Sequence, residues 1–117
     1  EEICKQYLWK QLLSGNCPVE FTSLGRWWGN NPKERIQEEI DIMGEQDKNT
    51  ALFAECKWTN EKVDIGVLET LVKRSKLFPY KNVHYYLFSK TGFTQGCMNQ
   101  ATEMVNVTLV CHEDMVT

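Results

Sequence analysis

Two short stretches in the middle of the chain alternate between apolar and charged residues with a period of two, which is typical of half-buried β-strands. They are Glu38–Met43 and Leu52–Trp58. If Asp41 lies opposite Glu55, the midpoint of the pair falls on Lys48, within a run of turn-forming residues. The two stretches are therefore predicted to pair as an antiparallel hairpin in that register.

The predicted hairpin sorts its side chains by face. Asp41, Glu55 and Lys57 come together on one face, while Ile40 and Ile42 share the other face, which is expected to pack on the core. On that apolar face the expected pairs are Ile40 with Cys56 and Ile42 with Ala54.

The polar face of the hairpin brings two carboxylates close together. Directly opposed side chains are about 5 Å apart, so Asp41 and Glu55 would repel each other unless a cation lies between them. A hard divalent ion, Mg²⁺ above all, is the usual solution, and the carbonyl of Cys56 is a natural further ligand. Lys57 is then placed to orient a metal-bound water or to stabilise charge on a phosphate. The alternative is an exposed polar face stabilised by an ion pair between Lys57 and one of the acids.

The remaining pattern predicts an α/β fold. Its expected order is helix, three strands in a meander, helix, strand, helix and strand, around a mixed central sheet. The last strand–helix–strand unit implies a parallel pair of strands. The predicted elements are a helix over Glu1–Leu13, a first strand over Phe21–Gly29, a helix capped by Asp64, an interior strand over Asn82–Ser89, a helix capped by Thr94 and a strand over Val105–Cys111.

Composition limits the function classes. With 117 residues the chain is expected to form one domain, and because it starts at Glu1 inside a predicted helix, we expect a fragment of a longer protein. The five cysteines form neither a disulfide framework nor a zinc pattern, which favours reduced thiols in a cytoplasmic protein. No apolar run is long enough for a membrane span. The formal net charge of −3 argues against strong non-specific binding of nucleic acid by the whole domain, so contact with DNA would need a local basic face.

Several side chains are candidates for nucleic-acid contact. In a strand, Trp27 and Trp28 face opposite ways, so one is expected in the core while the other could stack on a base, with Arg26 on a phosphate. The alternative is that both indoles pack structurally. Lys33 and Arg35, in a polar loop, could touch the nucleic-acid backbone or remain solvated.

A second basic group lies at the end of the helix that Asp64 begins. It consists of Lys73, Arg74 and Lys76. These residues are interpreted as complementing the carbonyl end of the helix, in preference to contacting phosphate.

Four ordered blocks resemble a known family. They are Gly25–Gly29, Glu39–Ile42, Glu55–Trp58 and Tyr86–Phe93, the last of which contains Lys90. The Asp41 and Glu55-Cys56-Lys57 elements resemble the PD-(D/E)XK nuclease superfamily, which includes restriction endonucleases and archaeal Holliday-junction resolvases. More narrowly, the blocks resemble a domain at the C-terminus of archaeal and bacterial AAA-type ATPases. The sequence departs from the superfamily pattern at Ile40, where a proline often precedes the aspartate.

The resemblance implies a restriction-endonuclease-like domain over residues 1–117 that cleaves DNA phosphodiester bonds with Mg²⁺ or Mn²⁺. Asp41 and Glu55 would hold the metal, with Glu1 of the first helix reaching towards it, although Glu2 is a rival and an acidic first turn suits any helix. Arg26, Trp28, Lys33, Arg35 and Lys90 would face DNA. The implied partners are DNA, an N-terminal ATPase domain that holds the ATP site, and a possible second copy of the chain. The alternative is a catalytically inactive module that binds DNA, dimerises or docks to the ATPase domain.

Overall fold

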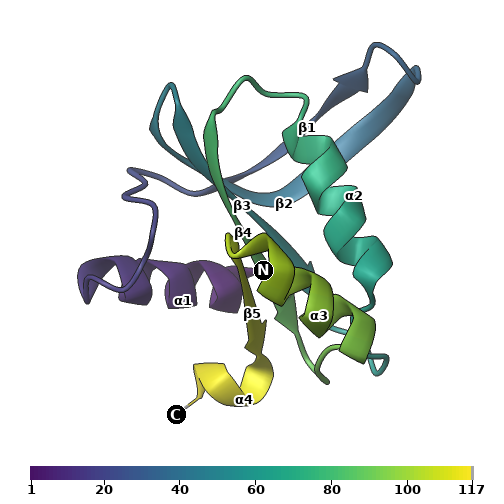
Figure 1. Ribbon diagram of the computed structural model, residues 1–117. Coiled ribbons are helices and arrows are strands. Elements are labelled where there is room, and N and C mark those ends of the chain that lie inside the picture. Colours follow the sequence, from purple (N-terminus) through teal and green to yellow (C-terminus); the bar gives the residue numbers. More distant parts are fainter. Residues whose placement is uncertain (117) are drawn as a thin grey trace.

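Five strands form one mixed sheet with helices packed on both faces (Figure 1). This computed structural model describes residues 1–116. The predicted order of elements is confirmed, and a short helix, α4, follows it. The elements are α1 (Glu2–Leu13), β1 (Gly25–Asn31), β2 (Ile36–Asp47), β3 (Thr50–Lys57), α2 (Ile65–Ser75), β4 (Asn82–Ser89), α3 (Gln95–Met104), β5 (Val107–Cys111) and α4 (His112–Met115).

The strands lie side by side in the order β1-β2-β3-β4-β5. The first two pairings are antiparallel, because hairpins connect these strands, and the last two are parallel, because α2 and α3 cross over between them. Right-handed crossovers that proceed in one direction place both helices on the same face. In Figure 1, α2 and α3 accordingly cover one face of the sheet, and α1 lies on the other.

Each of the two crossover helices begins where the sequence supplies a cap. The Asp64 carboxylate accepts the backbone N–H of Val67 at the start of α2, and the Thr94 hydroxyl accepts that of Cys97 at the start of α3. Both predicted caps are confirmed. These caps satisfy backbone donors that the first helical turn leaves without partners.

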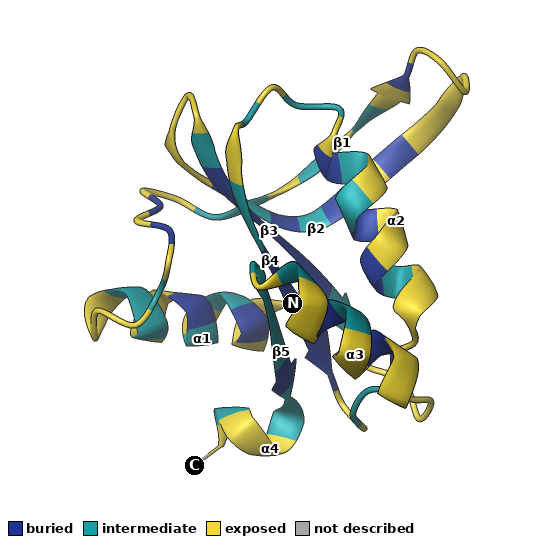
Figure 2. Cartoon of the chain, viewed as in Figure 1, coloured by how far each residue is buried: buried dark blue, intermediate teal, exposed yellow. Residues whose placement is uncertain are grey.

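The sheet has an apolar core on each face, and Figure 2 shows buried residues along its central strands. Strand β3 supplies both cores because its successive side chains alternate between the faces. The core under α1 contains Cys4, Leu8, Ile42, Leu52, Ala54, Tyr86 and Phe88, and the core under α2 and α3 contains Ile40, Ala51, Phe53, Leu68, Leu71, Tyr85, Leu87 and Cys97.

The expectation that Ile40 and Ile42 share a face is wrong. Both side chains are fully buried, but Ile42 packs under α1 and Ile40 under α2. The reason is an irregularity in β2: Gly25 is opposite Met43 while Trp27 is opposite Ile40, so β2 carries an extra residue at this point. The extra residue reverses the alternation between Ile40 and Ile42 and re-aims the backbone around Asp41.

The first strand is also shifted from its predicted range of Phe21–Gly29 and begins at Gly25. The preceding apolar residues cover the sheet instead of pairing in it: Phe21 is buried in the core under α1 and packs edge-on against Trp9. The segment crosses β2 closely at Gly44, where a Cβ atom would come within 2.8 Å of the Leu24 side chain. Apolar spacing alone does not distinguish such a covering segment from a strand.

No helix within residues 1–116 is long and apolar enough to cross a membrane. All five cysteines are free thiols, as the sequence predicts.

Candidate functional site

The β2–β3 hairpin brings Asp41 and Glu55 together in the predicted register. Ile42 pairs with Ala54, and the strands are joined by a tight turn between Asp47 and Thr50. Beyond the last backbone pair of the two strands, the backbone N–H of Cys56 donates to a side chain: Asp41 Oδ2 accepts it at 3.0 Å. That bond fixes the Asp41 carboxylate against the strand that carries Glu55.

Glu55 is an acid in an unusual environment. It is only 7% exposed, because α2 covers this face of β3. Burial, a hydrogen bond with Asp41 and the charge of Asp41 together raise the pKa of Glu55 to about 8, against the opposing charges of Lys57 and Arg74. Glu55 therefore holds a proton near neutral pH unless a cation takes the place of that proton.

Lys57 lies on the same face as Glu55, two residues along the strand. Its Nζ is 3.8 Å from Glu55 Oε1, and its side chain is 44% exposed. Its carbonyl accepts the backbone N–H of Lys90, which ties the end of β3 to the loop after β4. The amino group of Lys57 can therefore contact both buried Glu55 and a molecule that approaches from the solvent.

Arg74 of α2 was singled out from the sequence, but its contacts with the buried acids of the site were missed. Its Nε is 3.2 Å from Glu38 Oε1, and its Nη1 is 3.7 Å from Glu55 Oε2. Glu38 is 6% exposed and also accepts Asn31 Nδ2 at 3.3 Å. The guanidinium thus serves two buried acids, while Arg74 also lies in the last turn of α2, where it was predicted.

The sequence did contain a signal for Arg74. It lies three positions after Leu71 and six after Leu68, both fully buried, so it falls on the side of α2 that faces the sheet. A cation on the buried side of a helix needs a buried anion. The sequence pattern does not show which acid that is.

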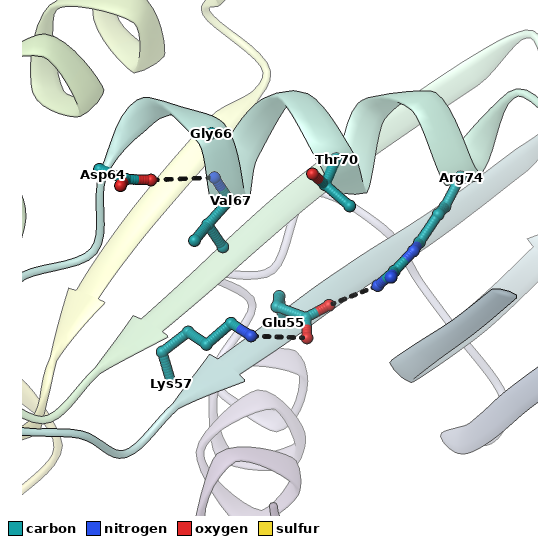
Figure 3. A pocket seen from close by; sticks show the side chains of 7 residues that line it. All are labelled: Glu55, Lys57, Asp64, Gly66, Val67, Thr70 and Arg74. Carbon is teal, nitrogen blue, oxygen red and sulfur yellow. Dashed lines mark hydrogen bonds and ion pairs between the residues drawn. The ribbon is translucent and has the colours of Figure 1, made fainter.

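A pocket of about 320 Å³ opens beside Glu55, between β3 and α2 (Figure 3). In Figure 3 the ends of Lys57 and Arg74 both point towards Glu55, and the Asp64 carboxylate points back to the Val67 N–H. The pocket is lined by Glu55, Lys57, Asp64, Gly66, Val67, Thr70 and Arg74.

Of the other two expected metal ligands, Glu1 is engaged by an arginine, and Cys56, whose carbonyl oxygen is the expected ligand, lies beside Asp41. The Glu1 carboxylate forms an ion pair with Arg26, whose Nη1 is also 3.1 Å from Glu39 Oε1. Cys56 gives its N–H to Asp41, and a hydrogen bond with the Cys4 thiol, together with burial, raises the pKa of the Cys56 thiol. Within residues 1–116 no group of three or more His, Cys, Asp and Glu side chains is arranged to hold a metal ion. The protein thus offers Asp41 and Glu55 as a pair of carboxylates.

The candidates for DNA contact lie in three places. Arg26 and Trp28 lie on β1, where Trp28 is 61% exposed and Trp27 packs against Phe78 on the other face. Lys33 and Arg35 are exposed in the turn between β1 and β2. Lys90 is exposed in the loop after β4, with its Nζ 3.2 Å from Asn60 Oδ1. The structure brings Lys90 near Lys57 through the backbone, but it does not gather these residues at one point.

A comparison with profiles of protein families shows to which family the chain belongs. The profile of DUF234, a family described as archaeal and bacterial proteins of unknown function, matches residues 1–74, a range that includes Asp41, Glu55, Lys57 and Arg74. The chain belongs to this family. A search of curated proteins found no match to this DUF234 chain.

Solved structures show the fold of this family member. The chain is similar to AF1548, a protein of unknown function, with a TM-score of 0.55 and 20% identity over 93% of this chain and 58% of that one. It is similar to the MspJI restriction endonuclease in complex with a 27-mer oligonucleotide, with a TM-score of 0.65 and 9% identity over 97% of this chain and 25% of that one. It is also similar to the DNA modification-dependent restriction endonuclease AspBHI, with a TM-score of 0.52 and 17% identity over 98% of this chain and 29% of that one.

These likenesses show a restriction-endonuclease-like fold for this DUF234 chain, as predicted. The chain spans about three fifths of the length of AF1548 and less than a third of the two restriction enzymes.

Proposed function

We propose that this domain cleaves DNA phosphodiester bonds with a bound divalent cation. The observation that carries the proposal is the adjacent pair of carboxylates, Asp41 and Glu55, with Lys57 on the same face of the hairpin. The restriction-endonuclease-like fold supports it, since MspJI and AspBHI are restriction endonucleases with that fold.

The residues present fit Mg²⁺ or Mn²⁺. Mg²⁺ prefers hard oxygen ligands and usually takes one or two protein carboxylates, with water and substrate phosphate oxygens as its other ligands. Asp41 and Glu55 would supply such a set. Burial and the neighbouring charge of Asp41 raise the pKa of Glu55, and a bound cation would offset both effects. When bound, the ion would stabilise negative charge that develops on the phosphate.

The chain's own residues have separate roles in this proposal. The Cys56 N–H fixes the Asp41 carboxylate, and Arg74 and Lys57 orient that of Glu55. The Lys57 amino group, which is half exposed, positions the attacking water against the phosphate. By the resemblance, the domain would be the C-terminal part of an AAA-type ATPase, with the ATP site outside this chain. The unpaired pattern of its five cysteines favours action in the cytoplasm.

A second candidate is a module that cleaves nothing. It would bind DNA, a second copy of the chain or the ATPase domain. The 61% exposure of Trp28 and the net charge of −3 favour a protein partner for such a module, because an exposed indole suits a contact surface and a negative domain binds DNA weakly.

Nicking of supercoiled plasmid in Mg²⁺ or Mn²⁺ separates the two functions. We expect activity in the wild type and loss of at least about 100-fold in Asp41→Ala and Lys57→Ala. Glu39→Ala, the oppositely facing acid, and Lys48→Ala, in the hairpin turn, are the matched controls and should retain activity. Equal nicking by all five preparations would refute the proposal, and DNA binding without nicking would favour the second candidate.

A further inference from the structure

The pocket in Figure 3 is lined by more polar groups than a site with two carboxylate metal ligands requires. Its wall carries two cationic groups, those of Lys57 and Arg74, and the hydroxyl-bearing side chain of Thr70. The Arg74 side chain is 25% exposed and that of Lys57 is 44% exposed, so both remain accessible from the solvent side. Two cations and a hydroxyl around one hollow form a surface suited to a phosphate group.

The two carboxylates in the same wall are committed to other partners. Asp64 accepts the N–H of Val67 as the cap of α2 and is turned towards the helix backbone. Glu55 is directed towards Asp41, Lys57 and Arg74, and in the proposed function it is a ligand of the cation. Neither acid therefore needs the space beside Thr70.

More groups hold the Arg74 side chain in place than its contact with Glu55 alone would require. Glu38 pairs with its Nε, and Asn31 donates to the second oxygen of Glu38. Asn31 also accepts the backbone N–H groups of Lys33 and Glu34, which anchors it in the turn between β1 and β2. A buried ion pair adds little net stability compared with apolar residues of similar volume. The network is better explained by the placement of a guanidinium at the pocket wall, where its five N–H donors exceed what two acids use.

We propose that this pocket binds a backbone phosphate of DNA next to the phosphodiester that is cleaved, with Arg74 and Thr70 as its contacts. This inference rests on the proposed function, because the DNA strand would pass over Asp41 and Glu55. Lys57, at the boundary between the two positions, would contact either phosphate.

The test compares two double variants with the same change in charge. Arg74→Met with Glu38→Gln removes the guanidinium of the pocket together with the buried acid that pairs with its Nε, and Glu55 keeps its contact with Lys57. Lys73→Met with Glu34→Gln is the matched control, because this adjacent ion pair has a 2.6 Å contact and lies outside the pocket lining. Both keep the formal net charge of −3, so any difference between them is local. The readout is the affinity for a short fluorescein-labelled DNA duplex in EDTA, measured by anisotropy at several salt concentrations.

The expected result is specific to the pocket. The slope of log Kd against log salt should fall by about 0.9 in the Arg74 double variant, with affinity about tenfold weaker, and remain unchanged in the control. Thr70→Val should weaken binding about fivefold without changing the slope, since it removes only a neutral hydroxyl. Equal slopes in the two double variants, or a wild type without salt-dependent binding, would overturn the inference.

Two further measurements address the folding of the variant and the source of the phosphate. If the Arg74 double variant does not fold, Arg74→Lys is used in its place. The inference then requires the wild-type salt slope with weaker DNA binding, and wild-type affinity would refute it. Titration of inorganic phosphate, followed by the amide shifts of Gly66 and Thr70, tests for a free anion. Shifts with phosphate but none with the duplex would overturn the assignment to DNA. A wild type that binds as expected but does not nick DNA would refute the proposed function and leave this site standing.

Discussion

Two arginines in this protein each bridge two glutamates, on opposite faces of the same sheet. Arg26 contacts Glu1 and Glu39 on the face of the sheet where α1 lies, while Arg74 contacts Glu38 and Glu55 beneath α2. Glu38 and Glu39 are neighbours on one strand, so the alternation of side chains alone sends them to different environments.

The two clusters differ in their access to water. The side chains of Arg26 and Glu39 are 43% and 49% exposed, whereas those of Glu38 and Glu55 are 7% and 9% exposed. Water and salt screen the first cluster, so its ion pairs contribute little. In the second cluster each charge depends on its partner, because there is little water to replace a lost contact. The same residue types therefore form weak surface ion pairs on one face and a buried polar site on the other.

The largest effect should come from Arg74→Met alone. It leaves Glu38 buried without its cation, and the free energy of unfolding should fall by about 3–5 kcal/mol. Urea unfolding followed by tryptophan fluorescence measures it. Adding Glu38→Gln should recover most of the loss, and failure of that second change to help would show that Arg74 acts through packing instead of charge.

The pH dependence of stability tests the environment of Glu55. Its folded pKa of about 8 lies above the ordinary value of 4.5, so the folded state holds the proton more tightly than the unfolded state. The stabilisation is complete below the unfolded value and is lost as the pH rises towards the folded value. For Glu55 alone, the free energy of unfolding should fall by about 3 kcal/mol between pH 5 and pH 8 without metal.

The control for this pH effect is Glu55→Gln, which should flatten the profile over the same range. Added Mg²⁺ should raise the melting temperature more at pH 8 than at pH 5, because at the higher pH no proton competes for the carboxylates. An equal rise at both values would contradict a cation site at Asp41 and Glu55.

A smaller effect is expected from Asn31→Ala. This change removes a hydrogen bond to buried Glu38 and the side-chain acceptor of the Lys33 and Glu34 N–H groups. A loss of about 1–2 kcal/mol in urea unfolding is expected. Asn30→Ala, at the exposed neighbouring position, is the control and should stay near the wild type.

The smallest effect should come from Arg26→Met. Because its partners are exposed, thermal melts in moderate salt should show no difference from the wild type beyond the scatter between repeats. A clear loss of stability, close to that of Arg74→Met, would remove the contrast between the two faces.

Much of the fold could be predicted because its signals are local. Asp64 and Thr94 start their helices, and the continuous apolar run of β4 shows a strand covered on both faces. The register that places Asp41 beside Glu55 follows from a period of two and a turn at its midpoint. The extra residue in β2 was missed because it arises from pairing with β1, which no pattern within β2 records.

The sequence by itself determined the β2–β3 hairpin and which of its residues are acidic or basic, since strand periodicity and turn chemistry act over a few neighbouring residues. Only the tertiary structure decided that Glu55 is buried, that Glu1 is bound to Arg26 and that Arg74 faces Glu38 and Glu55. Those outcomes depend on how a helix rotates and docks on a sheet, which is set by packing among residues far apart in the chain. The physical state of each charged group follows from that packing, because burial fixes how strongly a charge needs its partner.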